Sequence, residues 1–299
     1  MGQTPTHNKV TVQNSYVFIL YLYRNTIDIQ EIQMIYYQNI TECQGEYMKT
    51  FCLSIQKGGT GKTSLSMALA GELSKYGPTV LIDADPQGNT SGQLYPNVET
   101  ELADLLFEIA GGSKPDIKNA VKKTTFENLS IIPTAGLDGR LRLYAETLAA
   151  GKPWVMADLF AGLDGFDYCV IDTSPAFGPL EKSALLAADE CLTPLMGDTY
   201  GADGLTIFLD NLETLKRDQR AKQPAYNKIL FNAYDKRITS HERILHELKS
   251  GSGEHMEIYC FPTDPIYRRA QDKRTVIQEL TGAKPETRSE ISRLAADLR

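Results

Sequence analysis

The stretch SIQKGGTGKTS, residues 54–64, combines three glycines with two lysines. Successive backbone N–H groups of such a turn can wrap a phosphate, because glycine has no Cβ to hold the backbone away. A lysine can then reach the terminal phosphate oxygens, and a threonine hydroxyl can bind Mg²⁺. The spacing predicts these roles for Lys62 and Thr63. The expected phosphate-binding residues are Gly58, Gly59, Thr60, Gly61, Lys62, Thr63 and Ser64.

A phosphate loop follows a strand and opens a helix, and the segments on either side of this loop fit that arrangement. TFCLSI, residues 50–55, reads as a buried strand. The following residues place Leu65, Leu69 and Leu73 at helical spacing, and the helix is expected to end at Gly77. The helix N-terminus would add its dipole to the phosphate site.

Three aspartates are candidates for metal binding and catalysis. Asp172 ends the apolar run FDYCVID, and its carboxylate would hold Mg²⁺ through a water next to Thr63. A carboxylate in this position can also cap the next helix, and the two roles are compatible. Asp83 and Asp85 are two residues apart, so their side chains point the same way if the strand continues through them. The alternative is that ADPQGN, residues 84–89, forms an ordinary polar turn.

The rest of the chain alternates apolar strands with amphipathic helices. TVLIDAD, FDYCVIDTSP, YNKILFNAYD and EIYCFPTD read as strands, and ELADLLFEIA and the long segment 201–220 read as helices. Continuous apolar strands separated by helices indicate a parallel sheet covered on both faces. The predicted fold class is α/β, a single P-loop NTPase domain with a mostly parallel, twisted sheet and helices on both faces.

The loop departs from the common spacing GxxxxGK[ST] in an informative way. Gln56 occupies the first glycine position and Lys57 the second position. This form resembles the deviant Walker A motif of the MinD/ParA group of P-loop ATPases. LIDADPQGNTSG, CVIDTSPAFGP, FNAYDKR and FPTDPIYRRAQ resemble further motifs of the group, and the DPQGN form is ParA-like. The resemblance covers residues 48–299.

The resemblance implies ATP and Mg²⁺ as ligands and slow, partner-stimulated ATP hydrolysis as the activity. Asp85 would orient or activate the attacking water, and Asp83 would support the Mg²⁺ shell. Asn232, Pro262 and Asp264 fall in the stretches that resemble the nucleotide-base region.

The resemblance gives Lys57 a separate role. In this family the extra lysine reaches across a sandwich dimer to the partner's phosphates, like an arginine finger supplied in trans. The chain would then form a homodimer with ATP. The alternative is that Lys57 is an ordinary surface lysine.

A ParA protein also binds DNA without sequence preference. Although the net charge is −7, residues 216–243 hold eight basic residues against three acidic ones. Such a local surplus suits phosphate contacts, although a basic run is often only a solvated face. The candidate DNA-binding residues are Lys216, Arg217, Arg220, Lys236, Arg237, Arg243, Arg268, Arg269, Lys273 and Arg274.

The implied function is partition of a plasmid or chromosome in the cytoplasm at the nucleoid, with hydrolysis stimulated by a ParB-like or centromere-binding partner. One rival is a positioning switch that acts on a protein cargo or a membrane. Another is a slow dimer in which nucleotide only joins the subunits. Membrane attachment is disfavoured, because Ile291, Leu294, Ala295 and Leu298 near the C-terminus indicate a helix that packs in the core.

Residues 1–47 differ in composition from the rest, and Met48 is a candidate natural start. This segment would be an upstream extension or a small dimerisation or helix-turn-helix appendage. The five cysteines, Cys43, Cys52, Cys169, Cys191 and Cys260, follow no metal-ligand spacing. They are expected to be buried free thiols in a reducing cytosol.

Overall fold

The computed structural model describes residues 47–136, 139–197, 199–251 and 256–299. Contacts divide the chain into the units Met1–Tyr47 and Met48–Arg299. Of the segment predicted as an extension, residues 1–46 lie outside the described residues. Its assignment, and that of Met48 as a start, therefore stay predictions. The second unit contains every motif discussed above.

The second unit is built on one eight-stranded sheet with the order β3-β4-β2-β5-β1-β6-β7-β8. Every neighbouring pair is parallel except β3 and β4. This arrangement confirms the predicted α/β class and the mostly parallel sheet. The strands are β1 (Lys49–Leu53), β2 (Thr79–Ala84), β3 (Lys122–Lys123), β4 (Leu129–Ile132), β5 (Tyr168–Thr173), β6 (Glu190–Met196), β7 (Ala225–Tyr234) and β8 (Glu257–Pro262).

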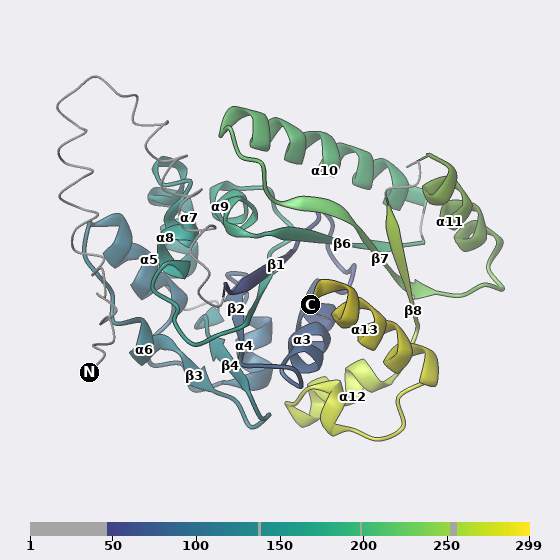
Figure 1. Cartoon of the computed structure of the whole chain (residues 1–299), viewed down its shortest axis with the longest axis horizontal. Helices are drawn as coiled ribbons and strands as arrows, with labels where there is room; N and C mark the ends of the chain where they lie inside the picture. The colour runs from purple at the N-terminus through teal and green to yellow at the C-terminus, as the bar shows by residue number, and fades with distance from the viewer. Residues whose placement is uncertain (1–46, 137–138, 198, 252–255) are drawn as a thin grey trace, which may run out of the picture. The chain divides into compact units, whose positions relative to one another are not determined.

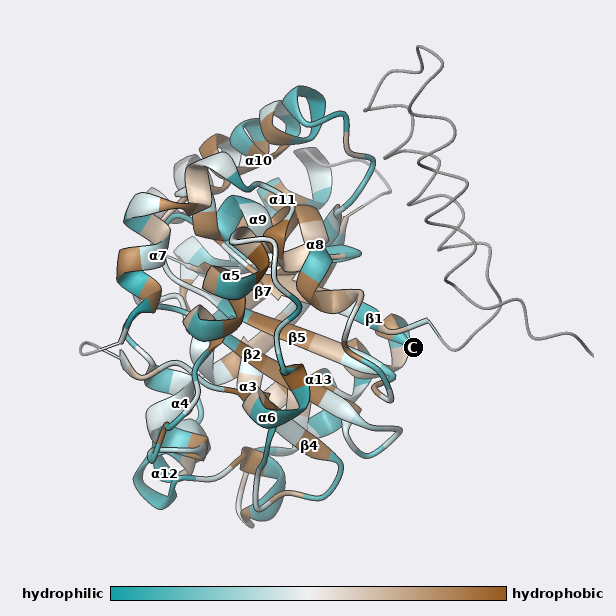
Figure 2. Cartoon of the chain, turned by 90° about the vertical axis from the view of Figure 1, so that its left-hand side faces the viewer, coloured by the Kyte–Doolittle hydropathy of each residue, from teal (hydrophilic) through white to brown (hydrophobic). Residues whose placement is uncertain are grey.

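The three central strands, β2, β5 and β1, are buried along nearly their whole length because both of their faces are covered. All six residues of β2 are buried, and so are five of the six in β5. Figure 2 shows hydrophobic colour concentrated on β2 and β5, with hydrophobic and polar colour mixed on the surrounding helices. Neighbouring residues in these strands contribute to two separate core clusters, one on each face of the sheet.

Helices cover both faces of the sheet, and Figure 1 shows α10 on one side of β6 and β7 and α13 on the other. The α-helices are α3 (Lys62–Leu73), α4 (Asn89–Leu94), α5 (Leu102–Ala110), α6 (Ile117–Ala120), α7 (Leu141–Thr147), α8 (Val155–Phe160), α9 (Pro179–Ala187), α10 (Thr199–Asp218), α11 (Thr239–Gly251), α12 (Ile266–Lys273) and α13 (Pro285–Leu298). Short 3-10 turns follow α7 and α12, at Ala149–Gly151 and Ile277–Glu279.

Helix α3 lies between the sheet and α13, and it is buried on nearly every side. Leu65, Leu69 and Leu73 are at most 1% exposed, as their helical spacing predicts. A helix in this position has a fixed axis, because close packing on several sides prevents it from rolling. The loop that precedes α3 is therefore anchored at its end.

Helix α13 confirms the prediction of a core-packing C-terminal helix. Ile291, Leu294, Ala295 and Leu298 are all buried in the cluster that α13 shares with α3. Within the described ranges, none of the helices is both long and apolar enough to span a membrane.

The described cysteines are free thiols, as predicted. Cys52, Cys169 and Cys191 are completely buried in β1, β5 and β6, and Cys260 in β8 is partly buried. Burial raises the pKa of the Cys191 thiol to about 12, which keeps it protonated and unreactive. Cys43 lies outside the described residues.

Candidate nucleotide and metal site

The glycine-rich loop connects the carboxyl end of β1 to the start of α3. Its backbone requires glycine at two positions, because Gly59 has φ +74° and Gly61 has φ +90°. A Cβ on Gly61 would also lie 2.2 Å from the side-chain nitrogen of Asn232. The amide of Asn232 donates to the carbonyl oxygen of Thr60 at 2.9 Å, so β7 supports the loop from the side.

The start of α3 is chemically suited to an anion. No side chain caps its first turn, and that turn contains no acidic residue. Before the helix, the buried hydroxyls of Ser54, directly after β1, and of Thr60, in the loop, have no hydrogen-bond partner. Unpartnered N–H and hydroxyl groups at a helix N-terminus are the donors that a phosphate group can accept from.

The side chain of Lys62 folds back over its own loop. Its ammonium group donates to the carbonyl oxygen of Lys57 at 2.9 Å and lies 3.4 Å from that of Ile55. Burial lowers the pKa of Lys62, whereas the charge of Asp172 acts in the opposite direction. The ammonium therefore lies above the strand ends, where an anionic phosphate would be a stronger acceptor than the two carbonyls.

Two predicted metal-site carboxylates lie side by side at the carboxyl end of the sheet. Asp83 on β2 is directly opposite Asp172 on β5, and both are completely buried. Burial, followed by the charge of Asp172, raises the pKa of Asp83 to about 8. Burial also raises the pKa of Asp172 to about 6. Two adjacent buried acids create a strong demand for positive charge.

Both carboxylates accept hydrogen bonds from hydroxyl groups that were not among the predicted site residues. Ser66 donates to Asp172 at 3.1 Å and Thr90 donates to it at 2.7 Å. The Thr63 side chain also bonds Asp172 and lowers the pKa of that carboxyl. Ser91 donates to Asp83 through both its hydroxyl, at 2.6 Å, and its backbone N–H, at 2.8 Å. The hydroxyl pair in the NTSG sequence directly after the DPQG turn was the available signal.

Asp85 lies just beyond the strand. Because β2 ends at Ala84, the alternation that would align Asp85 with Asp83 does not extend to it. The backbone N–H of Asp85 instead donates to Asp83, and its carboxylate accepts the N–H of Gln87 at 2.9 Å. Asp85 is only 6% exposed, and its charge acts on Lys62. It remains at the same end of the sheet as the other two aspartates.

These residues fit Mg²⁺ held together with a nucleotide. The part of the chain that the structure describes contains no cluster of three or more His, Cys, Asp or Glu side chains able to cage a metal alone. Magnesium in nucleotide sites is usually held by one or two carboxylates together with phosphate oxygens. The pair Asp83 and Asp172, beside the hydroxyl of Thr63, is a donor set of this kind.

The two predicted base-region segments meet the loop to different extents. Asn232 lies against it, as described above. Pro262 ends β8 beside Tyr234. Both carboxylate oxygens of Asp264 accept hydrogen bonds that fix the turn around α12, from the backbone N–H groups of Ile266 and Lys284 and the hydroxyl of Thr287. A base-binding role for Asp264 stays a prediction.

Gln56, where the loop departs from the common motif, is attached to a distant helix. Its side-chain oxygen accepts from the amide of Asn211 on α10 at 2.8 Å. The next residue, Lys57, is anchored by its backbone, whose N–H donates to Ile55 at 2.8 Å. Gln56 and Lys57, the deviant part of the motif, are thus held by one hydrogen bond to α10 and by one within the loop.

The predicted DNA-binding residues do not form one patch. Because β6 and β7 are parallel, α10 returns the chain to the amino end of β7, where Lys216, Arg217 and Arg220 lie. Lys236 and Arg237 follow the carboxyl end of β7, about 33 Å away at ~3.3 Å per strand residue. The predicted basic residues that follow the carboxyl ends of β7 and β8 are here called the carboxyl-end basic group. They are Lys236, Arg237, Arg243, Arg268, Arg269, Lys273 and Arg274.

One basic residue in the run 216–243 is not on the surface. Lys228 on β7 is buried, and its ammonium lies 2.8 Å from Glu190 and 3.8 Å from Glu257. It contributes no surface charge, so the run is less basic than the sequence count indicates. Several exposed members are also paired with neighbours, such as Arg237 with Asp235 at 2.6 Å.

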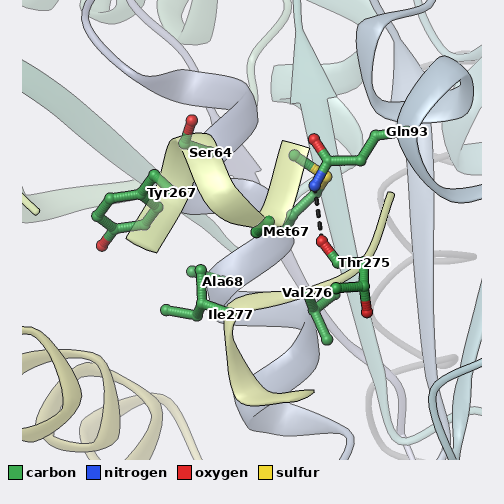
Figure 3. A pocket seen from close by; sticks show the side chains of 9 residues that line it. Ser64, Met67, Ala68, Gln93, Tyr267, Thr275, Val276 and Ile277 are labelled. Atoms are coloured by element: carbon green, nitrogen blue, oxygen red, sulfur yellow. Dashed lines mark hydrogen bonds between the residues drawn. The ribbon is translucent and has the colours of Figure 1, made fainter. Parts of the chain in front are cut away.

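A small cavity separates α3 from α4 and α12, as the side chains in Figure 3 show. Its volume is about 10 Å³, which holds about one water molecule and is too small for a nucleotide. Across it, the amide of Gln93 on α4 donates to the carbonyl oxygen of Thr275 at 2.7 Å. Helix α4 therefore connects the aspartate pair with the segment that follows the basic helix α12.

The domain is similar in sequence to known proteins. A protein-family model described as an AAA domain matches residues 48–224. An uncharacterized protein of Borreliella burgdorferi is 30% identical over 259 residues, which are 83% of this chain and 98% of the relative. A virulence plasmid ParA family protein of Chlamydia psittaci is 35% identical over 208 residues, 64% of this chain and 79% of the relative.

The fold also matches solved structures. An ATP complex of a McdA variant from Cyanothece has a TM-score of 0.74 and 23% sequence identity, and the match covers 85% of this chain and 97% of that one. At this level of identity the similarity establishes the fold. The sequence relatives establish the family.

Proposed function

Since the chain belongs to the ParA family of partition ATPases, we propose that it hydrolyses ATP in a dimer that binds DNA without sequence preference. A ParB-like or centromere-binding partner would stimulate hydrolysis and release the DNA. The observation that carries this proposal is the loop itself, in which Lys57 and Lys62 flank the glycines at the end of the sheet where Asp83 and Asp172 also lie.

Each site residue has a role that its position supports. Lys62 moves from the loop carbonyls to the terminal phosphate oxygens of ATP, and the N–H groups at the start of α3 hold the β-phosphate. Thr63, Asp172 and Asp83 would hold Mg²⁺, which neutralises phosphate charge when bound. Asp85 orients the attacking water. Positioning and charge stabilisation account for most of the rate in such a reaction.

Lys57 acts on the nucleotide of the other subunit. In this proposal its ammonium reaches the phosphates of the partner subunit's ATP, so that nucleotide becomes part of the dimer interface. The side chain of Gln56, bonded to Asn211, holds the segment from which Lys57 projects. Pairing and hydrolysis would both depend on this residue.

DNA would bind at the carboxyl-end basic group. These residues share an end of the sheet with the nucleotide site, and Gln93 connects α4 directly to the segment after α12. Nucleotide occupancy can therefore influence this surface through a short contact. The residues Lys216, Arg217 and Arg220 lie at the opposite end of the sheet. The helix that carries Lys216 and Arg217 also contacts the loop, but through Asn211, which bonds Gln56 more than one turn before them.

Charge reversal tests this location. We expect Arg268→Glu with Lys273→Glu to weaken ATP-dependent DNA retention about tenfold or more. The slope of the logarithm of the binding constant against the logarithm of the salt concentration should fall by the amount expected for the loss of about two phosphate contacts per subunit. Arg269 is left unchanged because its guanidinium donates to Thr281 and holds the turn after α12. Retention is measured on linear duplex DNA over a range of salt concentrations.

The matched control carries the same charge change at the other end of the sheet, in Arg217→Glu with Arg220→Glu. This variant should retain DNA nearly as well as the wild type. If both pairs lose retention equally, or if only the control pair does, the assignment to the carboxyl end is wrong. ATP hydrolysis without DNA serves as the check that each variant is folded.

A further inference from the structure

Helix α4 contributes two consecutive hydroxyl residues to the ends of two neighbouring strands. Thr90 donates to Asp172 on β5 at 2.7 Å. Ser91 donates to Asp83 on β2 at 2.6 Å through its hydroxyl and at 2.8 Å through its N–H. All four side chains are at most 1% exposed, so water does not compete for these bonds. One short helix thus orients both carboxylates of the pair.

The position of α4 is itself tightly determined. Gly88 precedes it with φ +64°, and a Cβ there would lie 2.7 Å from the backbone of Gly136. The hydroxyl of Ser91 also accepts the N–H of Thr134 at 2.8 Å, while the hydroxyl of Thr134 donates to the carbonyl oxygen of Asp83 at 2.6 Å. The hydroxyl of Ser91 therefore donates one bond and accepts another, and it cannot turn away from Asp83 without breaking both.

We propose that Thr90 and Ser91 are positioning residues of the metal site, which fix Asp172 and Asp83 in the orientation that Mg²⁺ and ATP require. The inference rests on the proposed function, because it takes these carboxylates as metal-site residues. The two carboxylates are adjacent and buried, and each would lose its fixed orientation if its hydroxyl donor were removed. Partners that orient metal-site carboxylates typically change metal affinity or activity by 10- to 100-fold when replaced.

The test is the Mg²⁺ dependence of nucleotide binding. Binding of a fluorescent ATP analogue is measured while Mg²⁺ is titrated, so that the result does not depend on turnover. In Thr90→Val, the Mg²⁺ concentration that gives half of the Mg²⁺-dependent change in analogue binding should rise by about tenfold or more. Binding of the analogue without Mg²⁺ should stay within about twofold of the wild type. Thr90→Ser keeps the hydroxyl and should restore the wild-type titration.

Thr79→Val is the matched control, because Thr79 is equally buried on β2 but its hydroxyl bonds Gly77 at the other end of the strand. It should titrate like the wild type. If Thr90→Val does not fold, Ser91→Ala replaces it, since it keeps the N–H bond to Asp83 and removes only the hydroxyl. A normal Mg²⁺ titration in these variants overturns the inference, whereas a wild type without Mg²⁺-dependent binding overturns the proposed function instead.

Discussion

Lys57→Ala should bind ATP with near wild-type affinity but lose both ATP-dependent pairing and hydrolysis. Residues that stabilise transition-state charge in trans contribute about 10³- to 10⁵-fold to the rate of phosphoryl transfer. Lys62→Ala should instead weaken ATP binding itself, because the ammonium of Lys62 lies over its own loop. Nucleotide binding, sedimentation with ATP and turnover separate the two outcomes.

A mixture of two inactive variants distinguishes action in trans from action in cis. Lys57→Ala has an intact Asp85, and an Asp85 variant has an intact Lys57. If Lys57 acts across the interface, the mixed dimer contains one complete site, and turnover should reappear on mixing. Persistent inactivity of a dimer that demonstrably forms, or normal turnover of monomeric Lys57→Ala, would rule out the trans assignment.

The second large effect is expected at Asp85. Replacing this carboxylate should reduce turnover by about 10²- to 10⁴-fold, the usual contribution of a group that moves or orients a proton. ATP binding and pairing should persist, because Asp85 does not belong to the loop. The variant should therefore remain on DNA as a stable ATP-bound dimer, and turnover and DNA dissociation are the measurements.

Asp85→Asn is the informative substitution. Asparagine can still accept the N–H of Gln87, which Asp85 accepts at 2.9 Å, so the turn after β2 keeps its geometry while the charge is removed. Asp85→Ala removes both the charge and this bond. If Asp85→Asn turns over at the wild-type rate, another group positions the water. If only Asp85→Ala is inactive, the role of Asp85 is structural.

The sequence predicted the fold and the loop because both depend on local patterns. Strands such as TVLIDAD are apolar on both faces only when helices cover both sides of a parallel sheet. The loop glycines and Lys62 are specified by backbone geometry and spacing. The short antiparallel strand β3, Lys122–Lys123, has no such pattern and was not expected.

The contacts between segments could not be read from the sequence. Thr90 and Ser91 follow a turn and look like polar turn residues, and only the packing of α4 brings them to two different strands. Lys228 looks like part of a basic run, but the sheet buries it between two glutamates. The run itself spans a helix and a strand that reverse the chain direction, so closeness in sequence did not give closeness in space.

The central claim is that ATP controls binding to DNA without sequence preference. Retention of the wild-type protein on a linear duplex of arbitrary sequence, compared with ATP, with ADP and without nucleotide, tests it most directly. The account predicts strong retention with ATP at low salt, a steep loss as salt rises, and little retention with ADP or without nucleotide. Retention that does not depend on the nucleotide, or no retention with ATP at low salt, would contradict it.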